Sequence, residues 1–536
     1  MNRHRPIASF ITLLLATVAA LGAIRPAAAQ PPPTPPDSET YAEDEFETVG
    51  EIVDFPEPDE PLRLKLLEAV PTALSWPDRP LGEFFAEVLG TEHVETETEL
   101  SEVPLGIQSI PDRPRLIIEW NERFLGPGFL PPGIELPTGA VWRPALWVFG
   151  AYRGAYQYFD TNRAVDPVSE IANSLELFGQ VNLSGTERIL VGMRPLDQET
   201  LTSREFTGWN LRNGDYIDGG NAQIQTLFFE GDFGEIFPFL DPYDSYFLDY
   251  GFSVGRMPLF IQQGLLINED KLDAVTVSRN TLNGSGVLNM LITGVYSWDH
   301  ITRSSSVGRP TPIDDGSQMV GIFTETDVFR STINLDGVYV YGDPQFGDMC
   351  AFGASAIQRF YGAHNTYNTS LHVLASFPTN GVTPFADQGE LLFAQTSWTP
   401  HHTEDLIYVN AFWAIDQFTG PARGQLFGGP LGQTGILFAA PALGRAGTPI
   451  NNATNNVAGA SLGYQFQFDE TRQQLIWEVG GRKETNSPVN QGVIVTGMRY
   501  QKAFGRHFIG IVDGFVGKPE GMNVTTGARA ELLIKF

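Results

Sequence analysis

Residues 528–536 alternate between apolar side chains and mostly charged ones, and the chain ends on an aromatic residue. In an extended strand, successive side chains point to opposite faces. Ala530, Leu532 and Phe536 therefore share one face, and Arg529 and Glu531 share the other. We predict a terminal β-strand with one apolar and one charged face. The pattern is typical of a lipid-facing barrel strand, but an edge strand of a soluble β-protein would show it too.

The same period-two alternation recurs from about Val141 to the C-terminus, in segments of roughly ten residues separated by turn residues. We count about 18 such segments, with about 16 as the alternative, and both are even numbers of the kind that closed antiparallel barrels use. The predicted fold class is therefore an all-β, up-and-down antiparallel barrel. The segments run near 141–158, 174–184, 187–196, 221–230, 246–257, 272–281, 286–298, 317–327, 331–341, 348–360, 366–376, 389–399, 404–417, 458–468, 472–483, 491–502, 506–516 and 524–536.

The lengths of the connections support this parse. In an up-and-down barrel whose two ends lie on one side, every second connection is short and the others are longer. Connections such as 185–186, 328–330 and 503–505 are short, whereas the alternate set contains the long segments 197–220 and 418–457. The connection 231–245 is too long for its side. The number of strands could therefore differ by two from this count, and the prediction of a closed barrel would remain the same.

The N-terminus has the features of an export signal. Arg3 and Arg5 precede an apolar run from Ile7 to Ile24, and small residues stand before Gln30. We predict a cleaved signal peptide over residues 1–29. No later stretch is long and apolar enough for a membrane helix, so an exported chain of this kind stays soluble or crosses a membrane as strands.

Between the signal and the strands the chain changes character twice. Residues 30–62 are rich in Pro and acidic side chains and cannot bury a core, which predicts a disordered tether. Residues 63–138 contain short apolar runs broken by prolines. They are either a small periplasmic segment or a plug that enters the barrel. The barrel itself is predicted over residues 139–536.

Composition removes several classes of function. The formal net charge of −29 argues against nucleic-acid binding, which needs a basic surface. Cys350 is the single cysteine, so an internal disulfide is excluded. Gly459-Ala460-Ser461-Leu462-Gly463 matches a hydrolase nucleophile motif, but Ser461 lies within an alternating strand rather than before a helix. The histidines lack metal-ligand spacing. We therefore expect no enzyme activity, no cofactor and no metal.

The terminal strand with its final Phe536 resembles that of bacterial outer-membrane porins, in which the last strand is read by the barrel-assembly machinery. In addition, Gly255-Arg256-Met257-Pro258, followed by Leu265-Leu266-Ile267-Asn268 and Asp273, is similar to a pattern in alginate-export and carbohydrate-type porins.

This resemblance implies an outer-membrane location in a Gram-negative cell and Phe536 as the assembly signal. Its expected partners are outer-membrane lipid, the assembly machinery and small hydrophilic solutes, with further copies of the chain as an additional candidate and no nucleic acid. The implied function is passive diffusion of small hydrophilic solutes, with anions or sugars as candidates. An export channel for an anionic polysaccharide is the alternative, and a barrel enzyme or adhesin is a weaker one.

The segment 418–457 is Gly-rich and apolar, with only Arg423 and Arg445 charged. An apolar loop of this length is poorly suited to water, so we predict that it folds into the lumen and constricts the pore. Arg423, Phe427, Phe438 and Arg445 are its candidate constriction residues. Packing at the rim or between subunits of an oligomer is the alternative.

A set of charged side chains falls on the polar faces of the predicted strands. One interpretation is a cationic ladder that guides anions, because guanidinium groups stay charged and bind carboxylates or phosphates in a bidentate manner. The other is that acidic neighbours neutralise the arginines and merely stiffen the wall. The candidate pore-lining residues are Arg153, Arg188, Arg194, Glu176, Glu478, Arg482, Arg499, Arg529 and Glu531.

Overall fold

The computed structural model describes residues 113–126, 132–160, 167–201, 204–243, 245–284, 286–305, 311–362, 365–469, 471–486 and 492–536. All of them belong to the unit His93–Phe536. The predicted signal peptide, the tether at 30–62 and residues 63–112 lie outside the described part of the chain.

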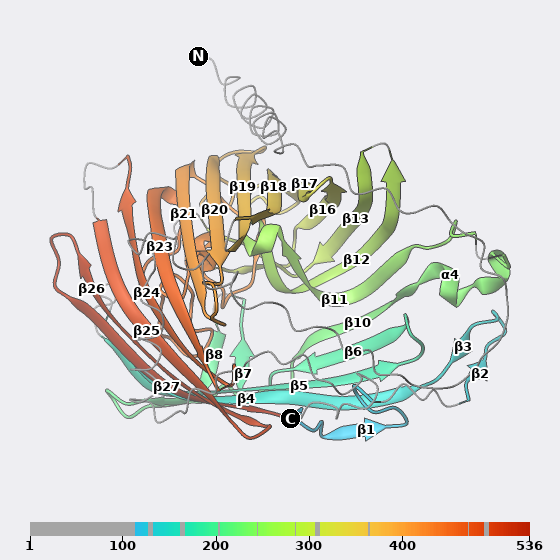
Figure 1. The fold of residues 1–536 in the computed structure, drawn as a ribbon, viewed down its shortest axis with the longest axis horizontal. Helices are drawn as coiled ribbons and strands as arrows, with labels where there is room; N and C mark the ends of the chain where they lie inside the picture. The colour runs from blue at the N-terminus through green and yellow to red at the C-terminus, as the bar shows by residue number, and fades with distance from the viewer. Residues whose placement is uncertain are drawn as a thin grey trace, which may run out of the picture. The chain divides into compact units, whose positions relative to one another are not determined.

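Within these residues, 18 strands pair in sequence as antiparallel neighbours, and the last pairs with the first to close a ring (Figure 1). The ring consists of β4 (Ala145–Asp160), β5 (Val168–Asn182), β6 (Arg188–Met193), β10 (Ile224–Asp232), β11 (Gly251–Ile261), β12 (Ile267–Gly284), β13 (Val287–Asp299), β16 (Gln318–Val328), β17 (Ser331–Tyr341), β18 (Met349–Tyr361), β19 (Thr366–Pro378), β20 (Gly389–Trp398), β21 (Leu406–Gln417), β23 (Asn455–Phe468), β24 (Gln473–Glu484), β25 (Gly492–Phe504), β26 (Phe508–Pro519) and β27 (Thr525–Lys535).

Each predicted segment coincides with one strand of this ring, so the closed antiparallel barrel is confirmed with 18 strands rather than 16. The structure also contains the connection after the fourth strand that is longer than the others at its end of the barrel. Residues 233–250 join β10 to β11 and contain the short helices α4 (Phe233–Ile236) and η2 (Pro238–Leu240). No helix of the described residues is long and apolar enough to cross a membrane.

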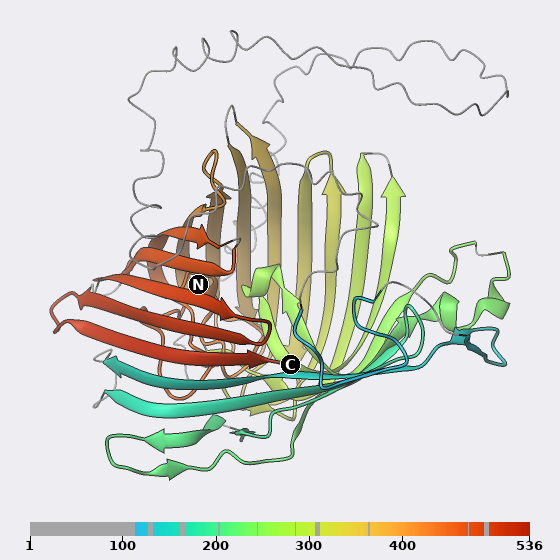
Figure 2. The same cartoon turned by 60° about the horizontal axis from the view of Figure 1, so that its bottom comes forward.

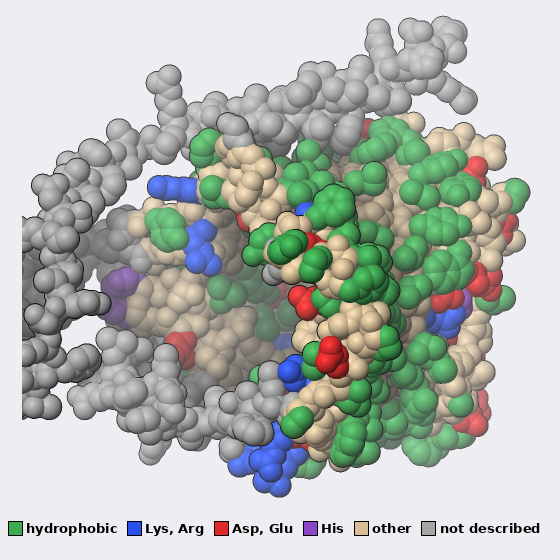
Figure 3. All heavy atoms as spheres, turned by 90° about the vertical axis from the view of Figure 1, so that its right-hand side faces the viewer, with side chains coloured by type: hydrophobic (Ala, Val, Ile, Leu, Met, Phe, Trp, Pro, Cys, Tyr) green, Lys and Arg blue, Asp and Glu red, His purple; other side chains and the backbone are tan. Residues whose placement is uncertain are grey.

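The two faces of the wall differ in the way that the alternation predicts. On β27, Leu532 is 42% exposed, whereas Arg529 and Glu531 are each 5% exposed. The same contrast holds on β21, where Trp413 faces outward and Phe412 is buried. On the face that Figure 3 shows, hydrophobic side chains gather over much of the outer wall. The outer surface of the ring is therefore apolar although it is exposed.

The ring closes where the two ends of the sequence meet. Arg529 on β27 stands opposite Gln157 on β4, and the C-terminal strands lie beside β4 in Figure 2. Phe536 continues the ladder, because its carbonyl accepts the N–H of Gly150 at 2.7 Å and its own N–H donates back at 3.1 Å.

The short strand β1 (Ile118–Trp120) pairs with β4 beyond this point, at Leu146–Val148. β1 thus pairs with the first part of β4, beyond the point where β27 and the chain end. The strands β2 (Ile134–Glu135) and β3 (Val141–Trp142) form a separate hairpin outside the ring. The described part of residues 63–138 therefore includes a strand added to the seam of the barrel.

At the end of the barrel opposite to the C-terminus, several connections fold back against the inner wall and form the main hydrophobic core with it. Leu265 and Leu266 from the β11–β12 connection, Ile301 from the β13–β16 connection and Phe438 from the β21–β23 connection are all fully buried. The core of this protein thus lies inside the ring of strands, between the loops and the wall.

Candidate functional site

The connection between β21 and β23, residues 418–454, crosses the interior of the barrel. Its short strand β22 (Ala422–Arg423) pairs in parallel with Ile267–Asn268 of β12, and the N–H of Gly424 donates to the carbonyl of Asn268 at 2.8 Å. In the ring, β13 and β16–β20 separate β12 from β21. The loop therefore reaches a distant part of the wall before it returns.

The returning part of the loop is bound to inward-facing side chains of the wall it left. The helix η4 (Pro430–Thr434) ends at Thr434, whose carbonyl accepts hydrogen bonds from Asn410 Nδ2 at 2.6 Å and Ser461 Oγ at 2.5 Å. The carboxylate of Glu478 then accepts the N–H groups of Ile436 at 2.8 Å and Leu437 at 3.0 Å. These side chains satisfy backbone groups that would otherwise be buried without partners.

Apolar contacts complete this attachment. The ring of Phe438 packs edge-on against Phe412 of β21, with 5.6 Å between centroids. A Cβ at Gly480 of β24 would lie 3.1 Å from the Phe438 ring, and one at Gly497 of β25 would lie 2.7 Å from Leu437. The wall thus carries glycines where the loop approaches it most closely.

The far part of the loop reaches the seam of the barrel. Arg153 of β4 donates to the carbonyls of Pro441 at 3.1 Å and Ala442 at 3.2 Å, and Arg529 of β27 donates to Pro441 at 3.3 Å. Arg445 forms an ion pair with Glu170 of β5 at 2.9 Å. The loop therefore crosses the interior of the ring and contacts strands on several sides of it.

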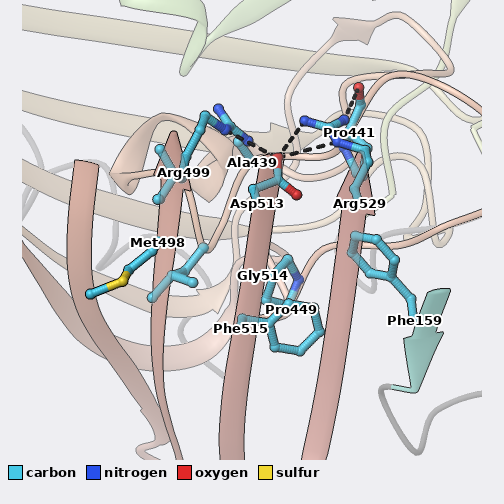
Figure 4. A pocket seen from close by; sticks show the side chains of 12 residues that line it. Phe159, Ala439, Pro441, Pro449, Met498, Arg499, Asp513, Gly514, Phe515 and Arg529 are labelled. Carbon is cyan, nitrogen blue, oxygen red and sulfur yellow. Dashed lines mark hydrogen bonds and ion pairs between the residues drawn. The ribbon is translucent and has the colours of Figure 1, made fainter. Parts of the chain in front are cut away.

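Figure 4 shows a small cavity of about 30 Å³ between this loop and the seam. Asp513 of β26 lies between two guanidinium groups, 2.6 Å from Arg529 and 3.2 Å from Arg499. Glu531 binds Arg153 through both carboxylate oxygens, at 2.7 and 3.0 Å. Arg153, Arg499 and Arg529 consequently share the two carboxylates of Asp513 and Glu531.

The other predicted arginines also have partners. Arg188 forms an ion pair with Glu230, and Arg194 binds Glu176 at 2.9 Å and Asp270 at 2.8 Å. Arg482 donates to backbone carbonyls of the loop, including that of Ala453 at 3.0 Å. The geometry places all of these guanidinium groups against acceptors rather than leaving a ladder of unpaired charges.

Of the predicted constriction residues, Arg423 is the most enclosed. It is 1% exposed and donates to the carbonyls of Gly264 and Leu265 in the β11–β12 connection. Burial lowers the pKa of Arg423 to about 10. Phe427 is half-buried and folds over Gly424 of its own turn. Arg423 thus fastens the loop to the β11–β12 connection. The side chain of Arg445, by contrast, is 47% exposed.

A second connection also inserts into the barrel. The helix η3 (Gln262–Gly264) places Gln262 between His372 Nδ1 and Asp336 Oδ2, at 2.7 Å from each. Gln262 and Gln263 both have positive φ, a conformation that costs on the order of 1 kcal/mol for residues other than glycine. The two hydrogen bonds inside the barrel offset this strain.

A third connection, 300–317, contains the pair β14 (Ile301–Thr302) and β15 (Ile313–Asp314). Arg303 and Asp314 form a fully buried ion pair there at 3.1 Å, and burial lowers the pKa of Arg303 from its usual value. Several loops thus share the interior with the segment 418–454.

Sequence reasoning missed several partners that this site requires. Asp513 and Glu170 neutralise arginines, and Asn410 and Gln157 bind loop carbonyls. Asp513 lies in a segment with apolar residues on both faces, so its orientation could not be read from alternation. Glu170 and Asn410 do follow the parity of their strands, but nothing local indicates which loop they bind.

Ser461 of the hydrolase-like motif is buried and donates to the carbonyl of Thr434, so its hydroxyl serves to hold the loop.

Among the described residues there is no cluster of three or more His, Cys, Asp or Glu side chains that could hold a metal ion. A polar hollow of about 270 Å³ lies between the last residues of the loop 418–454 and the ends of β23 and β24, and its lining includes Asn451, Asn455, Arg482 and Glu484.

No protein-family model and no curated protein matches this chain. Among solved structures, it is similar to the outer-membrane protein OpdK of Pseudomonas aeruginosa, at 10% identity over 73% of this chain and 98% of that one, with a TM-score of 0.48. It is also similar to OccK8 (OprE) of the same organism, at 11% identity over 73% and 97%, with a TM-score of 0.48. A third is OccK5 (OpdH), at 8% identity over 73% and 98%, with a TM-score of 0.49.

Proposed function

We propose that this protein is an outer-membrane channel for passive diffusion of small hydrophilic solutes. The ring of 18 strands has an apolar outer face, which suits lipid, and closure leaves no strand edge unpaired in a bilayer. A barrel of this strand number is too wide for its own wall side chains to fill, so its interior has room for the inserted loops and for a water-filled passage beside them. The signal-like N-terminus and the terminal Phe536 are in keeping with export and outer-membrane assembly.

The loop 418–454 carries this proposal, because it lies inside the ring and is bound to it on several sides. Glu478, Asn410 and Ser461 hold it on one wall, while Arg153 holds it at the seam. A loop fixed in this way narrows the passage to small solutes, and the charged groups around it bias which solutes enter. The polar hollow beside Asn451 and Arg482 provides hydrogen-bonding groups at the end of the barrel where the loop begins and ends.

Export of an anionic polysaccharide is less well supported. A long polyanion requires a wide passage lined by cationic groups along its length. Here several loops occupy the interior, and Arg153, Arg194 and Arg529 are engaged with carboxylates. Small neutral or singly charged solutes fit this arrangement better.

The deciding experiment is conductance of the purified, detergent-folded protein in a planar bilayer, combined with liposome swelling in sugars of increasing size. We expect stable ion-conducting steps and swelling in monosaccharides that falls off for larger oligosaccharides. A protein that stays in the lipid and resists SDS until heated, yet conducts no ions and passes no sugar, would contradict the proposal.

A further inference from the structure

The connection between β10 and β11, residues 233–250, stands at the end of the barrel where the chain terminus lies. The other connections at this end are short, for example 183–187, 329–330 and 505–507. This one is long and strongly aromatic. Its side chains are unusually exposed: Tyr243 by 91%, Phe247 by 72%, Tyr246 by 65% and Phe239 by 58%.

The aromatic connection is held in a defined shape. Arg279 of β12 donates to the carbonyl of Phe247 at 2.9 Å and to that of Tyr246 at 2.7 Å, and its guanidinium carbon lies 4.6 Å from the centre of the Tyr250 ring. Asp241 accepts the N–H and the hydroxyl of Ser245, and these bonds lower the pKa of the Asp241 carboxyl. The rings are therefore presented outward by hydrogen bonds rather than exposed by lack of structure.

The base of the connection is continuous with the outer, apolar wall. Gly231 has the same parity as the exposed Leu227, and a Cβ there would lie 3.1 Å from Ile236 of α4 and 3.6 Å from the Phe229 ring. Phe229 in turn packs edge-on against Phe252 of β11. The same apolar surface thus runs from the wall of β10 and β11 onto α4.

The chemistry of the exposed groups identifies the surroundings that they suit. Exposed apolar area in water costs roughly 25 cal/mol per Å², so a fixed display of large rings is unfavourable in an aqueous phase. Tyrosine and phenylalanine together suit the boundary between lipid headgroups and acyl chains. The connection carries four acidic residues, Glu235, Asp241, Asp244 and Asp249, and no Lys or Arg. Even with Arg279 of β12 counted, acidic side chains outnumber basic ones here, which matches a headgroup with an ammonium rather than an anionic one.

We propose that the β10–β11 connection is a lipid-binding foot, which lies in the headgroup region of the periplasmic leaflet and prefers zwitterionic phospholipids that carry a primary ammonium. This inference rests on the proposed outer-membrane location of the barrel. Figures 1 and 2 both show α4 at the edge of the ribbon, beside β2 and β3, and Gly139 of the β2–β3 hairpin approaches Pro238 of η2. The foot thus extends the contact with lipid beyond the cylinder of strands.

The test uses nitroxide labels on the full-length protein in vesicles of phosphatidylethanolamine and phosphatidylcholine, with Cys350→Ser as background. Phe247→Cys reports the foot. Ile322→Cys reports the outer wall of β16, where the side chain is 59% exposed, and Val382→Cys reports the connection at the opposite end of the barrel. Collisions of each label with oxygen, which partitions into lipid, are compared with collisions with a water-soluble nickel chelate.

We expect the Phe247 label to favour oxygen, as the Ile322 label does, and the Val382 label to favour the nickel chelate. Replacing phosphatidylethanolamine by phosphatidylglycerol should move the Phe247 label at least about threefold toward nickel accessibility, because acidic groups repel an anionic surface. If the Phe247 label behaves like the Val382 label while the Ile322 label remains in lipid, the proposed lipid-binding role of the connection is wrong and the proposed membrane barrel is unaffected. Strong spin–spin broadening between Phe247 labels would show a second copy on this surface and would also overturn the proposal. A water-accessible Ile322 label would instead overturn the proposed membrane barrel.

Discussion

Arg153 on the first strand of the ring and Glu531 on the last form a bidentate ion pair across the seam, although 378 positions separate them in the chain. The Glu531 side chain is 1% exposed, and Arg529 also binds it at 3.3 Å. The strands that close the barrel are therefore the ones that position charge beside the loop. The same side chains, Arg153, Arg529 and Glu531, thus join the first strand to the last and set the charge beside the loop.

Replacing Arg153 and Arg529 together by Ala should shift the channel toward cation selectivity. The change removes two positive charges from the seam and leaves Asp513 and Glu531 with Arg499 alone, so the charge beside the loop becomes more negative by two. The measurement is the reversal potential in a salt gradient. Lys518→Ala on β26 is the control and should change little, because Lys518 shares the outward parity of the exposed Val512 and Val516. An unaltered potential in the folded double variant would show that these arginines only stiffen the wall.

Glu531→Gln should act in the opposite direction. Three guanidinium groups would then share the single carboxylate of Asp513, and the reversal potential should move toward anion selectivity. Removing one partner of a buried ion pair also destabilises a protein, by about 3–5 kcal/mol in typical cases. The variant should therefore lose its SDS-resistant form at a lower temperature, measured by gel mobility after heating. A stable variant with unchanged selectivity would be inconsistent with the shared-carboxylate arrangement.

Deleting residues 424–447, with a short Gly-Ser bridge in their place, should enlarge the single-channel conductance. The loop occupies the lumen between β12 and the seam, so its removal widens the passage, and we expect an increase of about twofold or more. Conductance in planar bilayers measures the effect, and heat-modifiable mobility shows that the barrel has formed. Equal or smaller conductance in a folded deletion variant would place the narrowest point elsewhere.

Phe438→Ala should loosen the loop without removing it. The side chain is fully buried against Phe412 and Gly480, and large-to-small changes of this kind cost about 3–5 kcal/mol. We expect a lower unfolding temperature and noisier open-channel current, because the loop would leave the wall more often. Phe352→Ala on the outer face of β18 is the matched control and should leave the current noise unchanged. A quiet channel in Phe438→Ala would indicate that the polar contacts alone hold the loop.

Deleting Phe536 should reduce the amount of assembled protein in the outer membrane. The deletion removes the two backbone hydrogen bonds to Gly150 at the seam and the terminal aromatic group expected to be read during assembly. Outer-membrane yield and periplasmic degradation products measure the effect, and Phe536→Tyr should assemble normally. Full assembly of the deletion variant would remove Phe536 from the signal.

The strands of this barrel were predictable because their signal is local. Alternation places Arg529 and Leu532 on opposite faces whatever the rest of the chain does, and turn residues mark where each strand ends. The connection 233–250 shows the limit of this reasoning. Its length left 16 strands open as an alternative to 18, because connection length is only a statistical guide to which end of a barrel a loop occupies.

The amino-acid pattern alone was enough to predict the all-β class, the strand positions, the face on which most residues lie and the strand that ends the ring. The closed barrel was needed to show that Glu478 accepts the N–H groups of Ile436 and Leu437, and that Asp513 neutralises Arg499 and Arg529. These contacts join residues that are distant in the chain and come together only when the ring closes. Alternation is a property of each strand alone, whereas the path of a loop across the lumen depends on which side chains the closed wall presents to it.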